Sequence, residues 1–237
     1  MNLIRVVALV VVSMCLTACS TPKVPPPEAH AALPKIGAPD LRGATVFAVD
    51  PGASVVHVHV FRGGTLARLG HNHVMTSNQL SGRVWLQPTF ARSGFELEFP
   101  VAQLVVDDPR ARAAAGSEFP GEIPAEDREG TRNNMLRAEV LDAGRYPTIT
   151  LQSVRVAGDP QAARLTARIT IKGVARDVEV PAVVQIEGNH LTASGEFDIR
   201  QSDFGIKPFT IGMGALAVQD RLHVVFRVVA TRNTDDR

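Results

Sequence analysis

Alternation of apolar and polar residues is the feature that most restricts how this chain can fold. The segment SVVHVHVFR, which begins at Ser54, places Val56, Val58 and Val60 on one face of an extended strand and two histidines on the other. Because successive side chains of a β-strand point to opposite faces, this period of two predicts a strand with one apolar face. Similar runs follow along the chain: QLSGRVWLQP, GFELEFPVAQLVV, TITLQSVRV, ARLTARITI, VEVPAVVQIEG, HLTASGEFDI and RLHVVFRVVA.

Short turn signals separate these runs. Lys-Gly at residues 172–173 and Gly-Asn at residues 188–189 are typical of tight turns between antiparallel strands. Many short strands joined in this way predict a mainly β domain, either a barrel or a sandwich. The abundance of valine also favours strands. Alternation alone does not show which face of each strand points into the interior.

One segment, residues 107–147, is charged, rich in alanine and does not alternate. Within it we predict a helix from Pro124 to Ala143. Proline fits the first turn of a helix, and the acidic residues Glu126 and Asp127 favour the positive end of the helix dipole. An apolar stripe supports the helix: Met135, Leu136, Val140 and Leu141. We therefore expect a helix-containing insertion packed over or beside the strands.

The first residues, MNLIRVVALVVVSMCLTACS, have the pattern of a signal peptide. Arg5 provides the basic start, and the apolar run behind it is too short to span a bilayer. The letters Leu-Thr-Ala-Cys, which end at Cys19, resemble the lipobox of bacterial lipoproteins, whose cysteine carries lipid after cleavage. The resemblance implies lipidation of Cys19 and, with Ser20 behind it, sorting to the outer membrane. The alternative is an ordinary secretory signal with a cysteine there by chance.

A proline-rich stretch follows the cysteine and is predicted to be an extended tether. Residues 20–44 contain six prolines and few large apolar side chains, so they cannot form a core. The predicted organisation has four parts: residues 1–18 (signal peptide), 19–44 (lipidated N-terminus and tether), 45–231 (β-barrel domain) and 232–237 (C-terminal tail).

Cysteine and charge content exclude several classes of function. Both cysteines, Cys15 and Cys19, precede the domain, which excludes thiol catalysis, disulfides and cysteine-based zinc sites within it. The formal net charge of the chain is +1 and no basic cluster stands out, so nucleic acid is not an expected partner. The sequence does not indicate an oligomeric state.

Two histidine pairs, His57 with His59 and His71 with His73, are the candidate functional residues. Residues i and i+2 share one face of a strand, roughly 6.5–7 Å apart. In one hypothesis both pairs ligate a metal ion. In a second, His71 and His73 lie at the mouth of a cavity and bind the polar headgroup of an amphiphile. In a third, the histidines make only local hydrogen bonds. Further ligands for the metal hypothesis are Glu96, Glu98, Asp203 and His223.

Three segments in fixed order resemble the YceI-like family: MLRAEVLDAGRYPTITLQS, ITIKGVARDVEVP and SGEFDIRQSDFGIKPF. With LGHNH at residues 69–73, the chain looks like a lipoprotein variant of that family. The resemblance implies an extended eight-stranded antiparallel lipocalin-like barrel around a long apolar cavity. Some members are periplasmic proteins that bind polyisoprenoid lipids or quinones, so the resemblance also implies an amphiphilic ligand.

We therefore predict a binding protein without catalytic residues. The sequence contains no Gly-x-Ser-x-Gly motif, no phosphate-binding loop and no complete dinucleotide fingerprint. The predicted function is that of a membrane-anchored periplasmic protein that carries or stores a lipid, with an isoprenoid or quinone lipid as ligand and no other cofactor. The alternatives are a metal-binding protein or metal-dependent enzyme, and a ligand-free structural protein of the envelope.

Overall fold

The computed structural model describes residues 33–232. The predicted signal peptide, Cys19 and residues 233–237 lie outside the described residues. Between residues 33 and 232 no helix is both long enough and apolar enough to cross a membrane. Residues 33–44 contain no helix or strand, and part of this stretch lies on the barrel, where the Gln87 side chain donates to the main-chain oxygen of Asp40 (2.8 Å).

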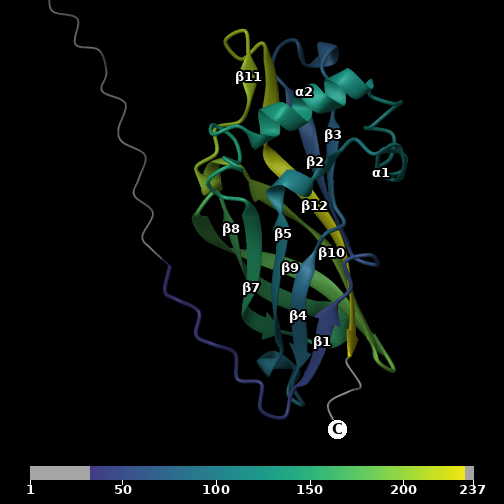
Figure 1. The fold of residues 1–237 in the computed structure, drawn as a ribbon, viewed down its shortest axis with the longest axis vertical. Helices are drawn as coiled ribbons and strands as arrows, with labels where there is room; N and C mark the ends of the chain where they lie inside the picture. Colours follow the sequence, from purple (N-terminus) through teal and green to yellow (C-terminus); the bar gives the residue numbers. More distant parts are fainter. Residues whose placement is uncertain (1–32, 233–237) are drawn as a thin grey trace, which may run out of the picture. The chain divides into compact units, whose positions relative to one another are not determined.

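Twelve strands within residues 33–232 form one antiparallel sheet (Figure 1). The first six are β1 (Thr45–Val49), β2 (Val55–Gly63), β3 (His73–Ser77), β4 (Ser81–Leu86), β5 (Gly94–Pro100) and β6 (Val105–Val106). The other six are β7 (Thr148–Ala157), β8 (Ala163–Ile171), β9 (Val174–Glu187), β10 (His190–Arg200), β11 (Thr210–Ile211) and β12 (Leu216–Arg232). Most strands pair with a neighbour in the chain, as in an up-and-down barrel.

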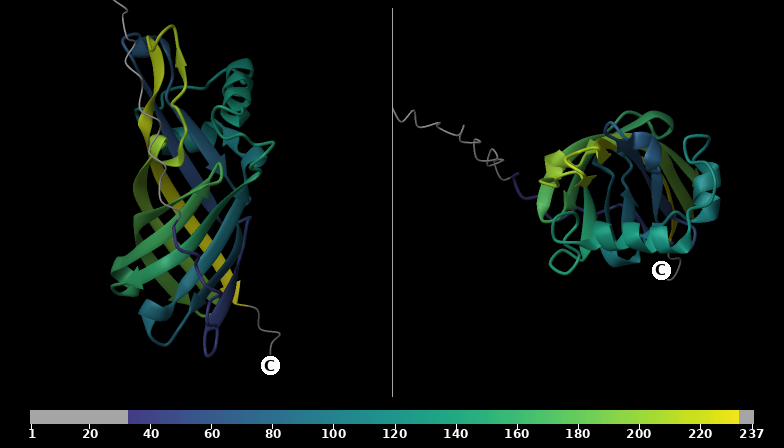
Figure 2. Two further views of the ribbon diagram at one scale, coloured as in Figure 1. Left: turned by 90° about the vertical axis from the view of Figure 1, so that its left-hand side faces the viewer. Right: turned by 90° about the horizontal axis from the view of Figure 1, so that it is seen from above.

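Eight of these strands close into a barrel because β1 pairs with β12 as well as with β4. The closed ring runs β1-β4-β5-β7-β8-β9-β10-β12. After a turn at residues 50–54, β2 continues the path of β1 along β12, and β3 pairs with β2. The wall therefore extends upward beyond the closed ring on one side (Figure 2). The predicted eight-stranded antiparallel barrel is confirmed.

The strand β2 shows which face of the alternating pattern points inward. Val56, Val58 and Val60 line the interior, whereas His57 and His59 lie on the outer face. Inward side chains from all eight barrel strands form one hydrophobic core. Burial of one such side chain stabilises the fold by roughly 1.5–3 kcal/mol. A slip of one residue would turn every inward side chain of a strand to solvent, so this core fixes the register of the sheet.

The strands β9 and β10 separate towards the upper end of the barrel. Their pairing stops at Val183 and Ser194, and a side chain at Gly195 would collide with the main chain of β9. The segment after β10 contains a 3₁₀ turn (Ser202–Phe204) that packs against both strands. Phe204 is fully buried there. The Ser-Asp-Phe-Gly motif thus closes the gap in the wall and has a structural role.

Two helices lie in the insertion between β6 and β7. The short helix α1 (Pro109–Ala114) packs on the outer face of β3, where Val74 and Phe119 are buried together. The longer helix α2 (Ala125–Leu136) lies across the upper end of the barrel (Figures 1 and 2). Met135 of α2 joins the barrel core. The insertion therefore covers one end of the barrel interior.

The predicted end of this helix at Ala143 is wrong, because α2 ends at Leu136. Arg137 has extended backbone, and the chain turns back so that the Leu141 N–H donates to the carbonyl oxygen of Met135 (3.1 Å). The apolar stripe still packs against the core, but its second half does so from this turn. Stripe periodicity alone does not distinguish a continuing helix from such a reversal.

Candidate ligand cavity

Two adjoining cavities occupy the interior of the barrel. The upper cavity has a volume of about 250 Å³ and the lower one about 100 Å³. Five residues line both: Val56, Phe99, Leu151, Phe197 and Val224. An eight-stranded barrel is either filled by its own side chains or holds one small ligand. This barrel keeps space on both sides of the five shared residues, which form a waist.

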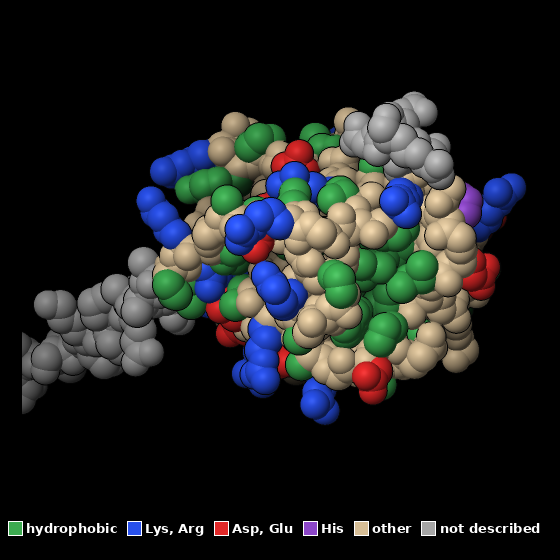
Figure 3. Space-filling view, turned by 90° about the horizontal axis from the view of Figure 1, so that it is seen from below, with side chains coloured by type: hydrophobic (Ala, Val, Ile, Leu, Met, Phe, Trp, Pro, Cys, Tyr) green, Lys and Arg blue, Asp and Glu red, His purple; other side chains and the backbone are tan. Residues whose placement is uncertain are grey.

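The lower cavity is lined almost wholly by apolar side chains, among them Trp85, Leu86 and Phe90. Figure 3, which views the molecule from below, shows hydrophobic side chains gathered inside a rim that carries charged ones. Among the described residues Ser93 is the one hydroxyl-bearing residue that lines this cavity, and its hydroxyl accepts a hydrogen bond from the Gln87 N–H (3.0 Å). The lower cavity therefore suits only an apolar occupant.

The upper cavity combines apolar walls with a few polar side chains. Four of its lining residues are polar: His73, Thr131, Asn134 and Gln201. No Lys, Arg, Asp or Glu side chain lines either cavity in the part of the chain that the structure describes. The cavity system thus has one titratable side chain on its wall, that of His73.

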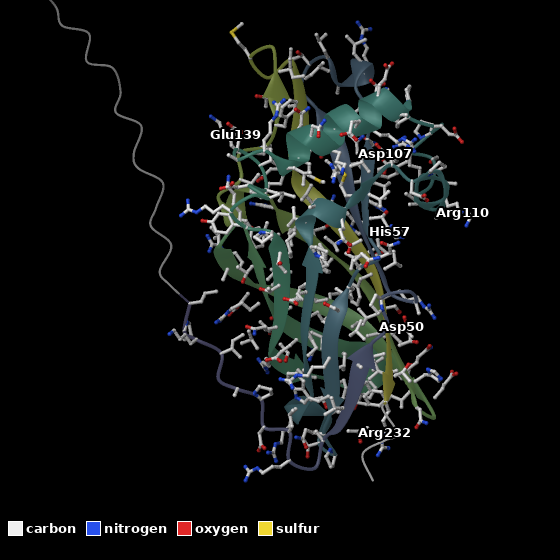
Figure 4. The ribbon with its side chains drawn as sticks, viewed as in Figure 1. Asp50, His57, Asp107, Arg110, Glu139 and Arg232 are labelled. Atoms are coloured by element: carbon white, nitrogen blue, oxygen red, sulfur yellow. The ribbon has the colours of Figure 1, made fainter. Side chains whose placement is uncertain are left out.

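A buried carboxylate holds His73 in place. The Nδ1 atom of His73 lies 2.6 Å from Oδ2 of Asp107, whose side chain is fully buried. The Val74 N–H donates to the other oxygen, Oδ1 (2.9 Å). Asp107 reaches this position through a left-handed backbone conformation with φ of 53°, which is uncommon outside glycine. Figure 4 shows Asp107 at the upper end of the barrel, near α2.

Arg112 of α1 neutralises Asp107 from the other side. Its Nη1 lies 2.7 Å from Oδ1 of Asp107, and its side chain is only 2% exposed. The remaining guanidinium N–H groups donate to the carbonyl oxygens of Asn72, Pro120 and Gly121. Arg112 therefore joins α1 and its following loop to the start of β3.

These contacts set the charge of Asp107. Burial by itself raises the pKa of a carboxyl group, because it disfavours the charged form. Hydrogen bonds from His73 and from the Val74 N–H, followed by that from Arg112, outweigh burial and hold the pKa of Asp107 below its usual value. Asp107 is therefore ionised at neutral pH and forms a buried ion pair behind His73.

The sequence profile of the YceI-like domain matches residues 47–230, most of the chain. The chain belongs to the YceI-like family. Among solved structures, BcnA from Burkholderia cenocepacia is 21% identical, with a TM-score of 0.56 over 77% of this chain and 99% of that chain. A polyisoprenoid-binding domain from Saccharophagus degradans, implicated in plant cell wall breakdown, is 12% identical, with a TM-score of 0.53 over 80% and 99%. No curated protein matches. At these identities the similarity concerns the fold.

The structure separates the two members of the GHNH pair in this YceI-like barrel. His73 begins β3 and lines the upper cavity, whereas His71 precedes the strand and is exposed. Their ring centroids are 6.4 Å apart. Burial of part of the ring lowers the pKa of His71, and the neighbouring His73 and Arg112 lower it further. Within the described residues His71 lies near His73 but lines neither cavity.

The other pair, His57 and His59, lies outside the YceI-like barrel. The Nδ1 atom of His57 lies 3.0 Å from the Thr76 hydroxyl, and the His59 ring packs near Phe119 and His223. Partial burial lowers the pKa of both histidines. The two pairs therefore do not converge on one point. Within residues 33–232 no group of three or more His, Cys, Asp or Glu side chains is placed to hold a metal ion.

The other residues considered as metal ligands have separate local roles. Glu96 forms an ion pair with Arg83 (2.7 Å) on the strands β4 and β5. His223 lies on the outer face, with Nδ1 2.9 Å from a carboxylate oxygen of Asp198. Asp203 is an exposed residue of the 3₁₀ turn after β10, and Glu98 is an exposed residue of β5.

Asp107 and Arg112 are the site residues that the sequence did not single out. Both lie in the charged insertion, where charge suggests a solvated surface. The only local signal is the stretch DDPRAR, in which Asp108 caps α1 and so turns Arg112 towards β3. Their link to His73 joins positions 34 residues apart, which no local pattern predicts.

Proposed function

We propose that this protein binds an amphiphilic lipid of the isoprenoid class in its barrel, as a membrane-anchored carrier or store that faces the periplasm. The observation that carries the proposal is the axial cavity system, which is almost wholly apolar in its lower part and has a few polar side chains, His73 among them, in its upper part. Ligand sites are typically apolar, with a few polar groups that fix orientation. The structure of a related domain from Saccharophagus degradans is described as polyisoprenoid-binding, which supports the same ligand class here.

The apolar tail would supply most of the binding free energy. Burial of each carbon contributes about 0.8 kcal/mol, so one five-carbon unit offers roughly 3–4 kcal/mol before the costs of binding. A single hydrogen bond contributes only about 1 kcal/mol net. The tail therefore gives affinity, and polar groups at the upper end select the headgroup. In this proposal His73 contacts the headgroup directly, His71 lies next to it, and no residue is catalytic.

Chemical extraction tests the proposal most directly. Protein purified under native conditions is extracted with organic solvent, and the extract is analysed by mass spectrometry. We expect a near-stoichiometric lipid with a repeating five-carbon chain. A protein that yields no lipid and takes up no added isoprenoid would support a ligand-free structural role instead. If elemental analysis of the same sample finds near-stoichiometric zinc or copper, that result would support the metal hypothesis.

The membrane anchor rests on the sequence Leu-Thr-Ala-Cys behind an apolar run. Several acyl chains on one cysteine give stable attachment, whereas one chain is marginal. The Cys19→Ala variant should lose labelling by a clickable fatty acid and move from the membrane to the soluble fraction. The matched control is Cys15→Ala, four residues earlier in the predicted signal peptide, which should keep both. Unchanged labelling of the Cys19→Ala variant would contradict lipidation at this site.

A further inference from the structure

The buried ion pair behind His73 determines which ring nitrogen carries the proton. An ionised carboxylate can only accept hydrogen bonds, and Oδ2 of Asp107 lies 2.6 Å from Nδ1 of His73. That contact requires a proton on Nδ1. In a neutral imidazole the other nitrogen, Nε2, then has a free lone pair and acts as an acceptor.

The Nε2 atom of His73 is the part of this network that remains open. Both oxygens of Asp107 are occupied, by His73, Val74 and Arg112. All three nitrogens of the Arg112 guanidinium group donate hydrogen bonds. Nε2 of His73 makes no hydrogen bond within residues 33–232. Among these residues only Arg176 has a fully buried side-chain polar atom without a hydrogen-bond partner, so Nε2 of His73 is not fully buried. His73 lines the upper cavity, so an occupant can reach its side chain.

The charges around the site oppose an anionic headgroup. The positive charge of Arg112 is already neutralised by Asp107, at 2.7 Å. No Lys or Arg side chain lines either cavity within the described residues. A diphosphate group would therefore enter without a cationic partner, and desolvation of an unpaired charge costs more than one hydrogen bond returns.

We propose that the cavity selects amphiphiles whose headgroup is uncharged and donates a hydroxyl hydrogen to Nε2 of His73. A prenylated hydroquinone and a prenyl alcohol share this chemistry, whereas the matching quinone and prenyl diphosphate lack it. The inference rests on the proposed lipid-binding function and adds the class of headgroup. Asp107 is a positioning residue in it, since it acts on the ligand only through His73.

The substitution Asp107→Asn should reverse the preference. The amide oxygen can keep the contacts of Oδ1 with Val74 and Arg112, which leaves the amide NH₂ facing Nδ1 of His73. An NH₂ group donates, so Nδ1 must then accept and the proton moves to Nε2. The cavity wall would present a donor, which is complementary to a quinone carbonyl. The matched control is Asp108→Asn, the same change at the α1 cap, where asparagine caps equally well.

The experiment combines imidazole ¹⁵N NMR with ligand binding, on the full chain at slightly alkaline pH. Signals of His73 are assigned by their loss in His73→Gln. Wild-type protein and Asp108→Asn should show the proton on Nδ1 of His73. They should bind the hydroquinone form of a short prenylquinone, under argon, about tenfold more tightly than the quinone form, as expected for one hydrogen bond. Asp107→Asn should show the proton on Nε2 and favour the quinone.

Further measurements distinguish a hydroquinone from an alcohol as the hydroxyl donor, and distinguish failure of this inference from failure of the proposed function. A prenyl alcohol of equal chain length tests whether a hydroxyl without the ring is sufficient, and the diphosphate should bind most weakly. The wild-type NMR result does not depend on Asp107→Asn, so a proton on Nε2, or on both nitrogens, overturns the proposal even if that variant does not fold. Equal affinity for hydroquinone and quinone also overturns it, while lipid binding itself stands. Failure of every prenyl compound to bind would instead overturn the proposed function.

Discussion

Replacement of Val224 by phenylalanine should lower affinity for a long isoprenoid chain about a hundredfold, because a blocked waist denies it roughly one five-carbon unit of buried contact. Val224 is buried and lines both cavities, so a larger side chain there occupies the waist between them. A chain short enough to stay above the waist should bind the variant nearly as well as it binds the wild-type protein. The measurement is a titration with fluorescent or isotope-labelled prenyl compounds of increasing length.

The matched control for this experiment is Val225→Phe, which adds the same ring on the outer face of β12. Val225 pairs with His57 of β2, outside the cavity. This variant should bind long and short chains as wild type does. Overpacking costs typically 1–3 kcal/mol, so the free energy of unfolding of both variants is measured in urea. Equal loss of long-chain and short-chain binding by Val224→Phe, or no loss, would contradict a ligand that passes the waist.

Replacement of Arg112 by methionine should destabilise the fold by about 3–5 kcal/mol, because it leaves the buried carboxylate of Asp107 without its cation. The control is Arg110→Met on the exposed side of the same helix (Figure 4), where a change within about 0.5 kcal/mol is expected. Urea unfolding followed by circular dichroism gives both values. The double variant Arg112→Met with Asp107→Asn should recover part of the loss, because no buried charge remains unpaired. Similar values for Arg112→Met and Arg110→Met would contradict a stabilising ion pair.

The same ion pair predicts a pH dependence whose sign is fixed by the lowered pKa of Asp107. A carboxyl group with a folded-state pKa below its unfolded value of 3.8 stabilises the fold above that value. This contribution is lost as the pH falls through the lowered folded pKa. In Arg112→Met the pKa of Asp107 rises, so the acid-induced loss begins at a higher pH. Unfolding curves from neutral pH down to about pH 3 test the shift.

Alternation predicted the strands because they depend on a local period, whereas the choice of a barrel over a sandwich came from the resemblance to the YceI-like family. Alternation in β2 assigns Val56, Val58 and Val60 to one face and His57 and His59 to the other, as observed. It could not show which face points inward, since valine and phenylalanine also occur on the histidine side. Which face points inward depends on closure of the barrel, to which contacts between all eight strands contribute.

The candidate site was only partly predictable for a related reason. The GHNH motif identified His73, but not the carboxylate that fixes its proton. Asp107 reaches His73 because β6 pairs with β3 and the backbone of Asp107 then turns into a left-handed conformation. Both events depend on tertiary packing. The end of α2 at Leu136 is similar, because the chain turns where the core, not helix propensity, places the apolar side chains.

The closure between β1 and β12 also determines how the domain responds to mechanical tension. Within residues 33–232, three residue pairs join these two strands, compared with eleven between β10 and β12. Because the strands are antiparallel, Thr45 and Arg232 leave the barrel at the same end (Figure 1). A force that pulls these two positions apart therefore peels the pairs open one after another, whereas a shearing force would load all of them together. The barrel should open at this seam first, and the unrolling of its first strand would expose the interior at the lower end.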